Sequence, residues 1–134
     1  MEGVRLHVRN GELADAGAWV YAWVAAGDDP CVVYVGATGL HPATRTWLHL
    51  HDPDPDISRI AARVSTAATE PFEVLAEPVP DGVVRSEERD AVIARLSELG
   101  LLTDRYVGFP PVVVERFGEA AERLVARIVE LLEG

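Results

Sequence analysis

The chain has 134 residues, of which 49% are hydrophobic and 25% are charged, and its formal net charge is −10 at pH 7. This composition predicts a single soluble globular domain and argues against a disordered chain. No apolar run approaches the length of a membrane span, and the first residues do not resemble a signal peptide, so a cytoplasmic protein is expected. The single cysteine, Cys31, excludes an intramolecular disulfide and is expected to be a small buried strand residue.

The acidic charge bears on which partners are expected. Proteins that bind nucleic acid neutralise phosphates with basic side chains, and a net charge of −10 slows the approach of a polyanion. All twelve basic residues are arginines, a bias that a GC-rich genome would also produce. Several of them could still gather on one side of the fold and form a local basic face, namely Arg5, Arg9, Arg45, Arg59, Arg63, Arg85 and Arg89.

The first half of the chain predicts a hairpin followed by a helix. Residues 4–8 alternate between apolar and polar side chains and predict a half-buried strand, after which residues 10–17 predict a turn or a short helix. Two apolar runs, residues 18–25 and 31–35, flank a Gly-Asp-Asp-Pro turn and predict a β-hairpin of two central strands that are covered on both faces. Residues 42–51 then predict a helix whose first turn contains Pro42.

The second half predicts one more strand and three helices. After an acidic, proline-containing loop, residues 57–64 have the spacing of a helix, and residues 72–78 predict a third core strand. Ser86 is a suitable N-cap for a helix that ends at Gly100. An irregular connection leads to a final helix over residues 114–132, which packs on the core or offers spare apolar surface to a protein partner.

Five polar or aromatic side chains stand out from this scaffold. Each strand of the hairpin carries a tyrosine, and the following helix places Arg45 and His49 on one face because they are four residues apart. On the helix after Ser86, Glu88 extends the apolar stripe whereas Glu87 points about 100° away. Two interpretations of Glu88 remain open: a metal ligand, or a carboxylate that complements the positive end of the helix dipole. The tyrosines are Tyr21 and Tyr34.

This arrangement resembles the GIY-YIG nuclease superfamily, in which two short strand motifs precede a helix with an arginine and, four residues later, a histidine or tyrosine. The matching tripeptides are Trp-Val-Tyr at residues 19–21 and Tyr-Val-Gly at residues 34–36, followed by Arg45 and His49. The resemblance covers roughly residues 18–95. It departs from the family at Trp19, where glycine is usual, and in having no asparagine near the C-terminal end.

The resemblance implies a fold and an activity. The fold is a single α/β (α+β) domain with a small three-stranded antiparallel sheet flanked by helices, with a core over about residues 18–100 and an extra C-terminal helix over about residues 114–132. The activity is that of a metal-dependent endonuclease that hydrolyses phosphodiester bonds in DNA, or in RNA.

The same resemblance implies a role for each candidate residue. Glu88 would hold one Mg²⁺ or Mn²⁺ ion, Tyr21 would activate water as the general base, and Arg45 would bind the scissile phosphate. Magnesium keeps several waters, so one carboxylate with a substrate phosphate is chemically sufficient. Gly36 would let the backbone approach the substrate closely. Tyr34 and His49 would orient the reacting groups or transfer protons.

Other interpretations of these residues remain open. The chain could be a GIY-YIG-like domain that has lost catalysis and binds a protein through its acidic surface and C-terminal helix. It could instead act on a nucleotide or a small phosphodiester, which needs no long basic groove. The tyrosines could be ordinary half-buried strand residues. A transition-metal site at His49, His51 and Asp52 would require the helix to end between the two imidazoles, because they otherwise point about 200° apart.

Overall fold

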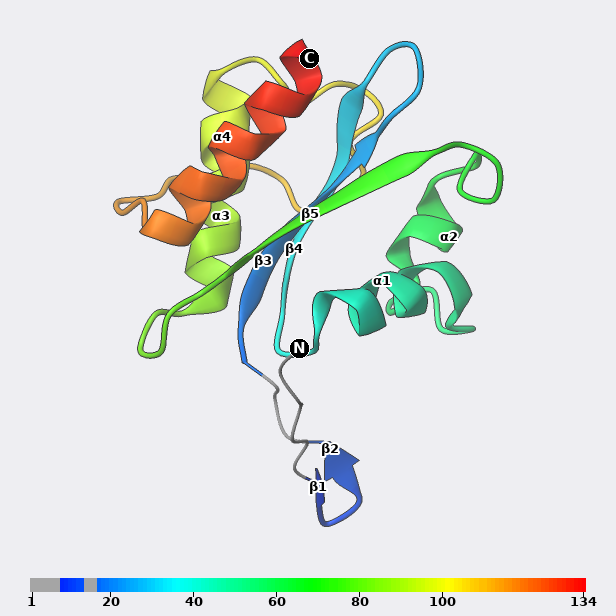
Figure 1. The fold of residues 1–134 in the computed structure, drawn as a ribbon, viewed down its shortest axis with the longest axis vertical. Coiled ribbons are helices and arrows are strands. Elements are labelled where there is room, and N and C mark those ends of the chain that lie inside the picture. Colours follow the sequence, from blue (N-terminus) through cyan, green and yellow to red (C-terminus); the bar gives the residue numbers. More distant parts are fainter. Residues whose placement is uncertain (1–7, 14–16) are drawn as a thin grey trace.

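The computed structural model describes residues 8–13 and 17–134. Within these residues the chain forms an α+β fold built on a three-stranded antiparallel sheet (Figure 1). The strands are β3 (Trp19–Ala25), β4 (Cys31–Thr38) and β5 (Phe72–Pro78), in the order β4-β3-β5. A separate two-stranded hairpin consists of β1 (Val8–Arg9) and β2 (Glu12–Leu13).

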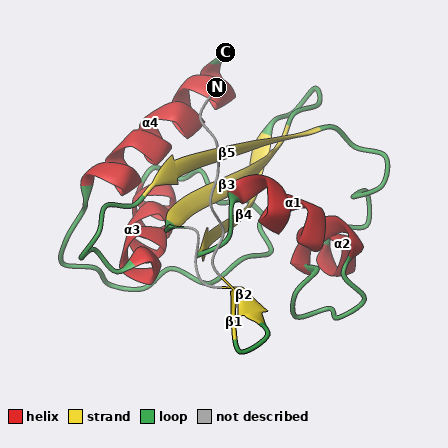
Figure 2. Cartoon of the chain, turned by 60° about the horizontal axis from the view of Figure 1, so that its bottom comes forward, coloured by secondary structure: helices red, strands yellow, loops and turns green. Residues whose placement is uncertain are grey.

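Helices cover both faces of the three-stranded sheet (Figures 1 and 2). One face is covered by α3 (Arg85–Glu98) and α4 (Glu119–Glu133), and the other by α1 (Pro42–His51) and α2 (Arg59–Arg63). None of the described helices combines the length and the apolar character needed to cross a lipid bilayer.

The central strand β3 divides its side chains between two cores. Val20, Ala22 and Val24 pack with α3 and α4, whereas Tyr21 and Trp23 belong to the second core, which includes residues of α1 and α2. This division follows from the two-residue period of a strand, since consecutive side chains point to opposite faces. Because both faces are covered, β3 is apolar throughout, as its sequence predicts.

A β-bulge in β4 lies next to Tyr34 and changes which face the first residues of the strand occupy. Trp23 of β3 is opposite Tyr34, but the next pair is Val24 with Val32, so one extra residue lies between them on β4. The extra residue shifts the alternation of β4 by one position. Consequently Val33 and Tyr34 both join the core that contains Tyr21, while Val35 joins the opposite core.

The sequence predicts most of these elements and misplaces some of their boundaries. The antiparallel hairpin, the α1 helix and the third strand are confirmed, and Cys31 is buried as expected. β4 is an edge strand rather than a central one, although it is buried on both faces, and it extends three residues further than predicted. Residues 8–13 form a short hairpin, and the rest of the predicted first strand lies outside the described residues.

Two helix starts differ from prediction. α3 begins at Arg85 after Val84, so Ser86 is inside the first turn and is not the N-cap. α4 begins at Glu119 rather than near residue 114. The β-branched valines that follow two prolines favour extended backbone over the residues before Gly118, and Gly118 itself is the N-cap.

Candidate functional site: a tyrosine–histidine cluster beside arginines

Tyr21, Tyr34 and His49 meet in the core between the sheet and α1. The Tyr21 hydroxyl and Nε2 of His49 share a hydrogen bond of 2.6 Å, and the Tyr34 and His49 ring centroids are 5.0 Å apart. The exposed fractions are 2% for each tyrosine and 0% for His49. Three of the five residues selected from the sequence therefore form one cluster, and the rest of the protein shields that cluster from solvent.

Burial and nearby cations set the protonation of this cluster. Burial is the largest cause that lowers the pKa of His49, to about 3, and three neighbouring arginines lower it further. The imidazole is therefore neutral at physiological pH. Burial also raises the pKa of the Tyr21 hydroxyl well above its usual value, with a further rise from Tyr34 that nearby arginines oppose. The Tyr21 phenol is accordingly protonated. The three arginines are Arg45, Arg59 and Arg63.

Gly36 has a packing role beside the cluster. It pairs with Tyr21 across the two strands, and a Cβ atom at Gly36 would lie 2.5 Å from the Tyr21 hydroxyl oxygen and 2.9 Å from Cε1 of Tyr34. Real Cβ atoms do not approach other atoms so closely, so only glycine fits between the two rings in this arrangement. The space that the sequence assigned to an approaching substrate is filled here by Tyr21.

The arginines near the cluster bind backbone carbonyls instead of carboxylates. Their guanidinium groups donate to three consecutive carbonyl oxygens of one loop, with bonds from Arg45 to Ile57, from Arg59 to Asp56 and from Arg63 to Pro55 of 3.0, 3.0 and 3.2 Å. In the part of the chain that the structure describes, none of these three has a carboxylate within 4.0 Å, although the protein has 22 acidic residues. Three guanidinium groups thus gather beside the tyrosine–histidine cluster of an acidic protein, on a loop that also carries Asp54 and Asp56.

Phe109 also belongs to this site, although no pattern in the sequence pointed to it. The centroid of its ring lies 6.4 Å from the centroid of the Tyr34 ring. Two guanidinium groups lie over the Phe109 ring, with the Cζ atoms of Arg59 and Arg89 at 5.0 and 4.1 Å from its centroid. Arg89 also pairs with the neighbouring Asp90 at 3.1 Å. The Gly-Phe-Pro-Pro composition indicated only a loop, and no periodic pattern links that loop to the hairpin.

Glu88 is buried as the sequence predicts but does not reach the cluster. Its exposed fraction is 4%, and Oε1 accepts a hydrogen bond of 3.3 Å from the backbone N–H of Ala121. A Cβ atom on Gly118 would lie 2.1 Å from the same oxygen. The carboxylate therefore occupies the positive N-terminal end of α4, where unpaired N–H groups attract an anion. Ala121 belongs to the core on the opposite face of the sheet from Tyr21.

The surroundings of Glu88 do not suit a hydrated divalent cation. Mg²⁺ keeps several water ligands, whereas this carboxylate is almost fully covered and is bonded to α4. In the described part of the chain there is also no group of three or more histidine, cysteine, aspartate or glutamate side chains that could hold a metal ion. α1 continues through His51, so it does not end between the imidazoles of His49 and His51, as the alternative transition-metal site would require.

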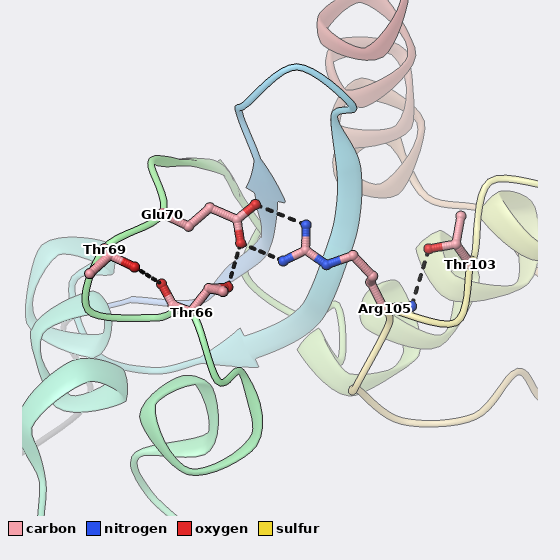
Figure 3. Close-up of polar contacts among 5 residues, drawn as sticks. All are labelled: Thr66, Thr69, Glu70, Thr103 and Arg105. Atoms are coloured by element: carbon pink, nitrogen blue, oxygen red, sulfur yellow. Dashed lines mark hydrogen bonds and ion pairs between the residues drawn. The ribbon is translucent and has the colours of Figure 1, made fainter.

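A second polar cluster fixes the loop that carries Phe109 (Figure 3). Arg105 donates two hydrogen bonds to the Glu70 carboxylate, one of them at 2.8 Å, and the Thr66 hydroxyl donates a third at 2.6 Å. The hydrogen bonds from Arg105 are the main cause that lowers the pKa of Glu70 to about 2. This ion pair joins the segment before β5 to the segment after α3, and no residue of it was selected from the sequence.

Comparison of the chain with protein-family models, with curated proteins and with solved structures finds no match.

Proposed function

We propose that this chain binds nucleic acid through its phosphates, at a site of GIY-YIG type formed by the solvent-accessible arginines beside the buried tyrosine–histidine cluster. The observation that carries the proposal is that Arg45, Arg59 and Arg63 have no carboxylate partner in the described chain, despite the excess of acidic residues. Guanidinium groups bind phosphate oxygens with charge-assisted hydrogen bonds.

The arginines are also held ready for a ligand. Each donates one hydrogen bond to a loop carbonyl, which fixes the side chain without neutralising its charge. A guanidinium group has five N–H donors, so donors remain for a phosphate. Fixing the side chains before binding reduces the entropy that is lost when the complex forms. Three guanidinium groups gathered at one place would attract phosphates locally, even in a protein of net charge −10.

A binding experiment tests this proposal. A fluorescent oligonucleotide is titrated with the protein at several salt concentrations, and Arg45→Gln is expected to weaken binding about ten-fold and to make it less dependent on salt. Arg95→Gln is the matched control, because Arg95 lies on α3 and stacks on Phe117 at 4.5 Å, away from the cluster. Equal effects of the two substitutions would contradict the proposed site.

Hydrolysis of the bound strand is a second candidate function, favoured by the short hydrogen bond between Tyr21 and His49. The phenol would have to lose its proton to act as a base, and its raised pKa opposes this in the absence of substrate. Metal-dependent cleavage would need a carboxylate, and the one that the resemblance selects, Glu88, is bonded to α4. In this arrangement Glu88 does not offer a free carboxylate to a metal ion beside Tyr21 and His49.

Plasmid nicking in Mg²⁺ or Mn²⁺ separates the two functions. Binding without nicking is expected if the site only holds phosphates. If the unaltered protein nicks DNA, Glu88→Gln decides whether Glu88 takes part. The amide retains an acceptor oxygen for the Ala121 N–H but is a poor metal ligand. Loss of nicking with unchanged thermal stability would then assign the metal to Glu88.

A further inference from the structure

Phe109 holds two arginines that come from different helices. Arg59 belongs to α2 and Arg89 to α3, and both guanidinium groups lie over its ring, at 5.0 and 4.1 Å from the centroid. A cation over an aromatic face is attracted by the quadrupole of the ring. All three side chains are partly accessible to solvent, so the stack lies at the surface beside the buried cluster.

Four contacts order the loop around Phe109, two of them within the loop and two to other parts of the fold. The Tyr106 hydroxyl donates to the Phe109 carbonyl at 2.7 Å, and the Val107 N–H donates to the Val33 carbonyl on the outer edge of β4 at 2.8 Å. A Cβ atom at residue 108 would lie 2.5 Å from the Tyr106 hydroxyl oxygen, so Gly108 is required for this packing. The fourth contact is the pair of hydrogen bonds from Arg105 to Glu70 (Figure 3).

These contacts give Phe109 a position that depends on the rest of the fold. Its ring contacts the Tyr34 ring, which in turn contacts His49. The stacked guanidinium groups are therefore fixed relative to the tyrosine–histidine cluster. A solvated arginine without this support would sample many rotamers and would lose more entropy when it bound a ligand.

We infer that Phe109 is a positioning residue, which holds Arg59 and Arg89 as ligands for the phosphates of a bound strand that flank the phosphate bound by Arg45. This inference rests on the proposed function and adds the residues that bind the flanking phosphates. A phosphodiester carries one negative charge, which Arg45 alone can balance. The additional cations at the Phe109 stack would then be matched by neighbouring phosphates. Asp90 neutralises part of the charge of Arg89, so Arg59 contributes more of it.

The test compares an oligonucleotide with a dinucleotide that has one phosphodiester. Arg59→Gln is expected to weaken oligonucleotide binding several-fold and to reduce the slope of log affinity against log salt by about 0.7 for single-stranded nucleic acid. It should leave dinucleotide binding unchanged, whereas Arg45→Gln weakens both. Arg95→Gln on α3 is the charge-matched control and should change neither.

Variants of Phe109 test positioning separately from charge. Phe109→Leu keeps an apolar side chain but removes the aromatic face, and it should weaken oligonucleotide binding about five-fold. Phe109→Tyr keeps the ring and should bind as the unaltered protein does. Phe117→Leu is the matched control, because it removes the stack under Arg95. Circular dichroism confirms that each variant is folded before binding is measured.

The possible results distinguish this inference from the proposed function. If Arg45→Gln weakens binding while Arg59→Gln and Phe109→Leu leave it unchanged, the inference is overturned and the proposed function stands with Arg45 but without Arg59. Equal effects of Arg59→Gln on the oligonucleotide and the dinucleotide would also overturn it. If the unaltered protein binds no oligonucleotide at low salt, both proposals fail.

Discussion

The buried imidazole of His49 makes the stability of this protein depend on pH above the range in which carboxylates titrate. The perturbation is acidification from pH 7 to pH 5, applied to the unaltered protein and to His49→Gln. His49 is 0% exposed in the folded protein, and its pKa is lowered to about 3 by burial and by three nearby arginines. In the unfolded chain its pKa returns to about 6.5.

The sign and size of the effect follow from proton linkage. Between these two pKa values the unfolded chain binds a proton that the folded protein does not, so the free energy of unfolding decreases as the pH falls. The decrease approaches about 1.4 kcal/mol per pH unit below 6.5, which gives about 2 kcal/mol between pH 7 and pH 5. The stabilisation is fully present above pH 6.5 and is lost on acidification toward the folded pKa.

Urea unfolding followed by tryptophan fluorescence measures this change, because Trp23 is buried in the same core as His49. His49→Gln is expected to be less stable at every pH, since it loses the hydrogen bond with Tyr21. Between pH 7 and pH 5, however, its free energy of unfolding should decrease by about 2 kcal/mol less than that of the unaltered protein. His51→Gln is the matched control on the exposed side of α1 and should keep the slope of the unaltered protein. Parallel curves for the unaltered protein and His49→Gln would refute the argument from burial.

Three further predictions follow from the packing. Gly36→Ala should lower the free energy of unfolding by about 1–3 kcal/mol, because the added Cβ meets the Tyr21 ring; equal urea midpoints for the two proteins would contradict this. Glu88→Ala should lower the free energy of unfolding by about 1 kcal/mol, because α4 loses the carboxylate that accepts from the Ala121 N–H. Glu88→Gln should be destabilised much less. Thermal unfolding with and without Mg²⁺ measures both variants. The ion pair of Glu70 should contribute stability above pH 4.5 that is lost as the pH falls toward 2, since the folded pKa is the lower one. Glu70→Gln should remove that pH dependence in acid unfolding, and a retained dependence would assign it to other carboxylates.

The local pattern of the sequence is sufficient for the elements that carry the cluster. Continuous apolar runs on either side of a turn predict the hairpin, and the four-residue spacing of Arg45 and His49 places both on one side of α1. The helical period also predicts that Glu88 is buried, and the structure confirms it. Each of these properties depends only on neighbours in the chain, so the sequence alone can determine it.

The partner of each functional side chain depends instead on contacts between distant residues. Tyr34 lies on the same face of the sheet as Tyr21 because the register of the two strands places it opposite Trp23, and no composition rule marks the bulge at which that register shifts. The sequence is compatible with a Glu88 carboxylate at the cluster or at the start of α4. Because α4 packs against α3, the carboxylate lies at the start of α4. Phe109 reaches the site because its loop is bonded to the edge of β4 and to Glu70. Periodicity shows which side of an element is buried, whereas only the assembled fold determines what lies against it.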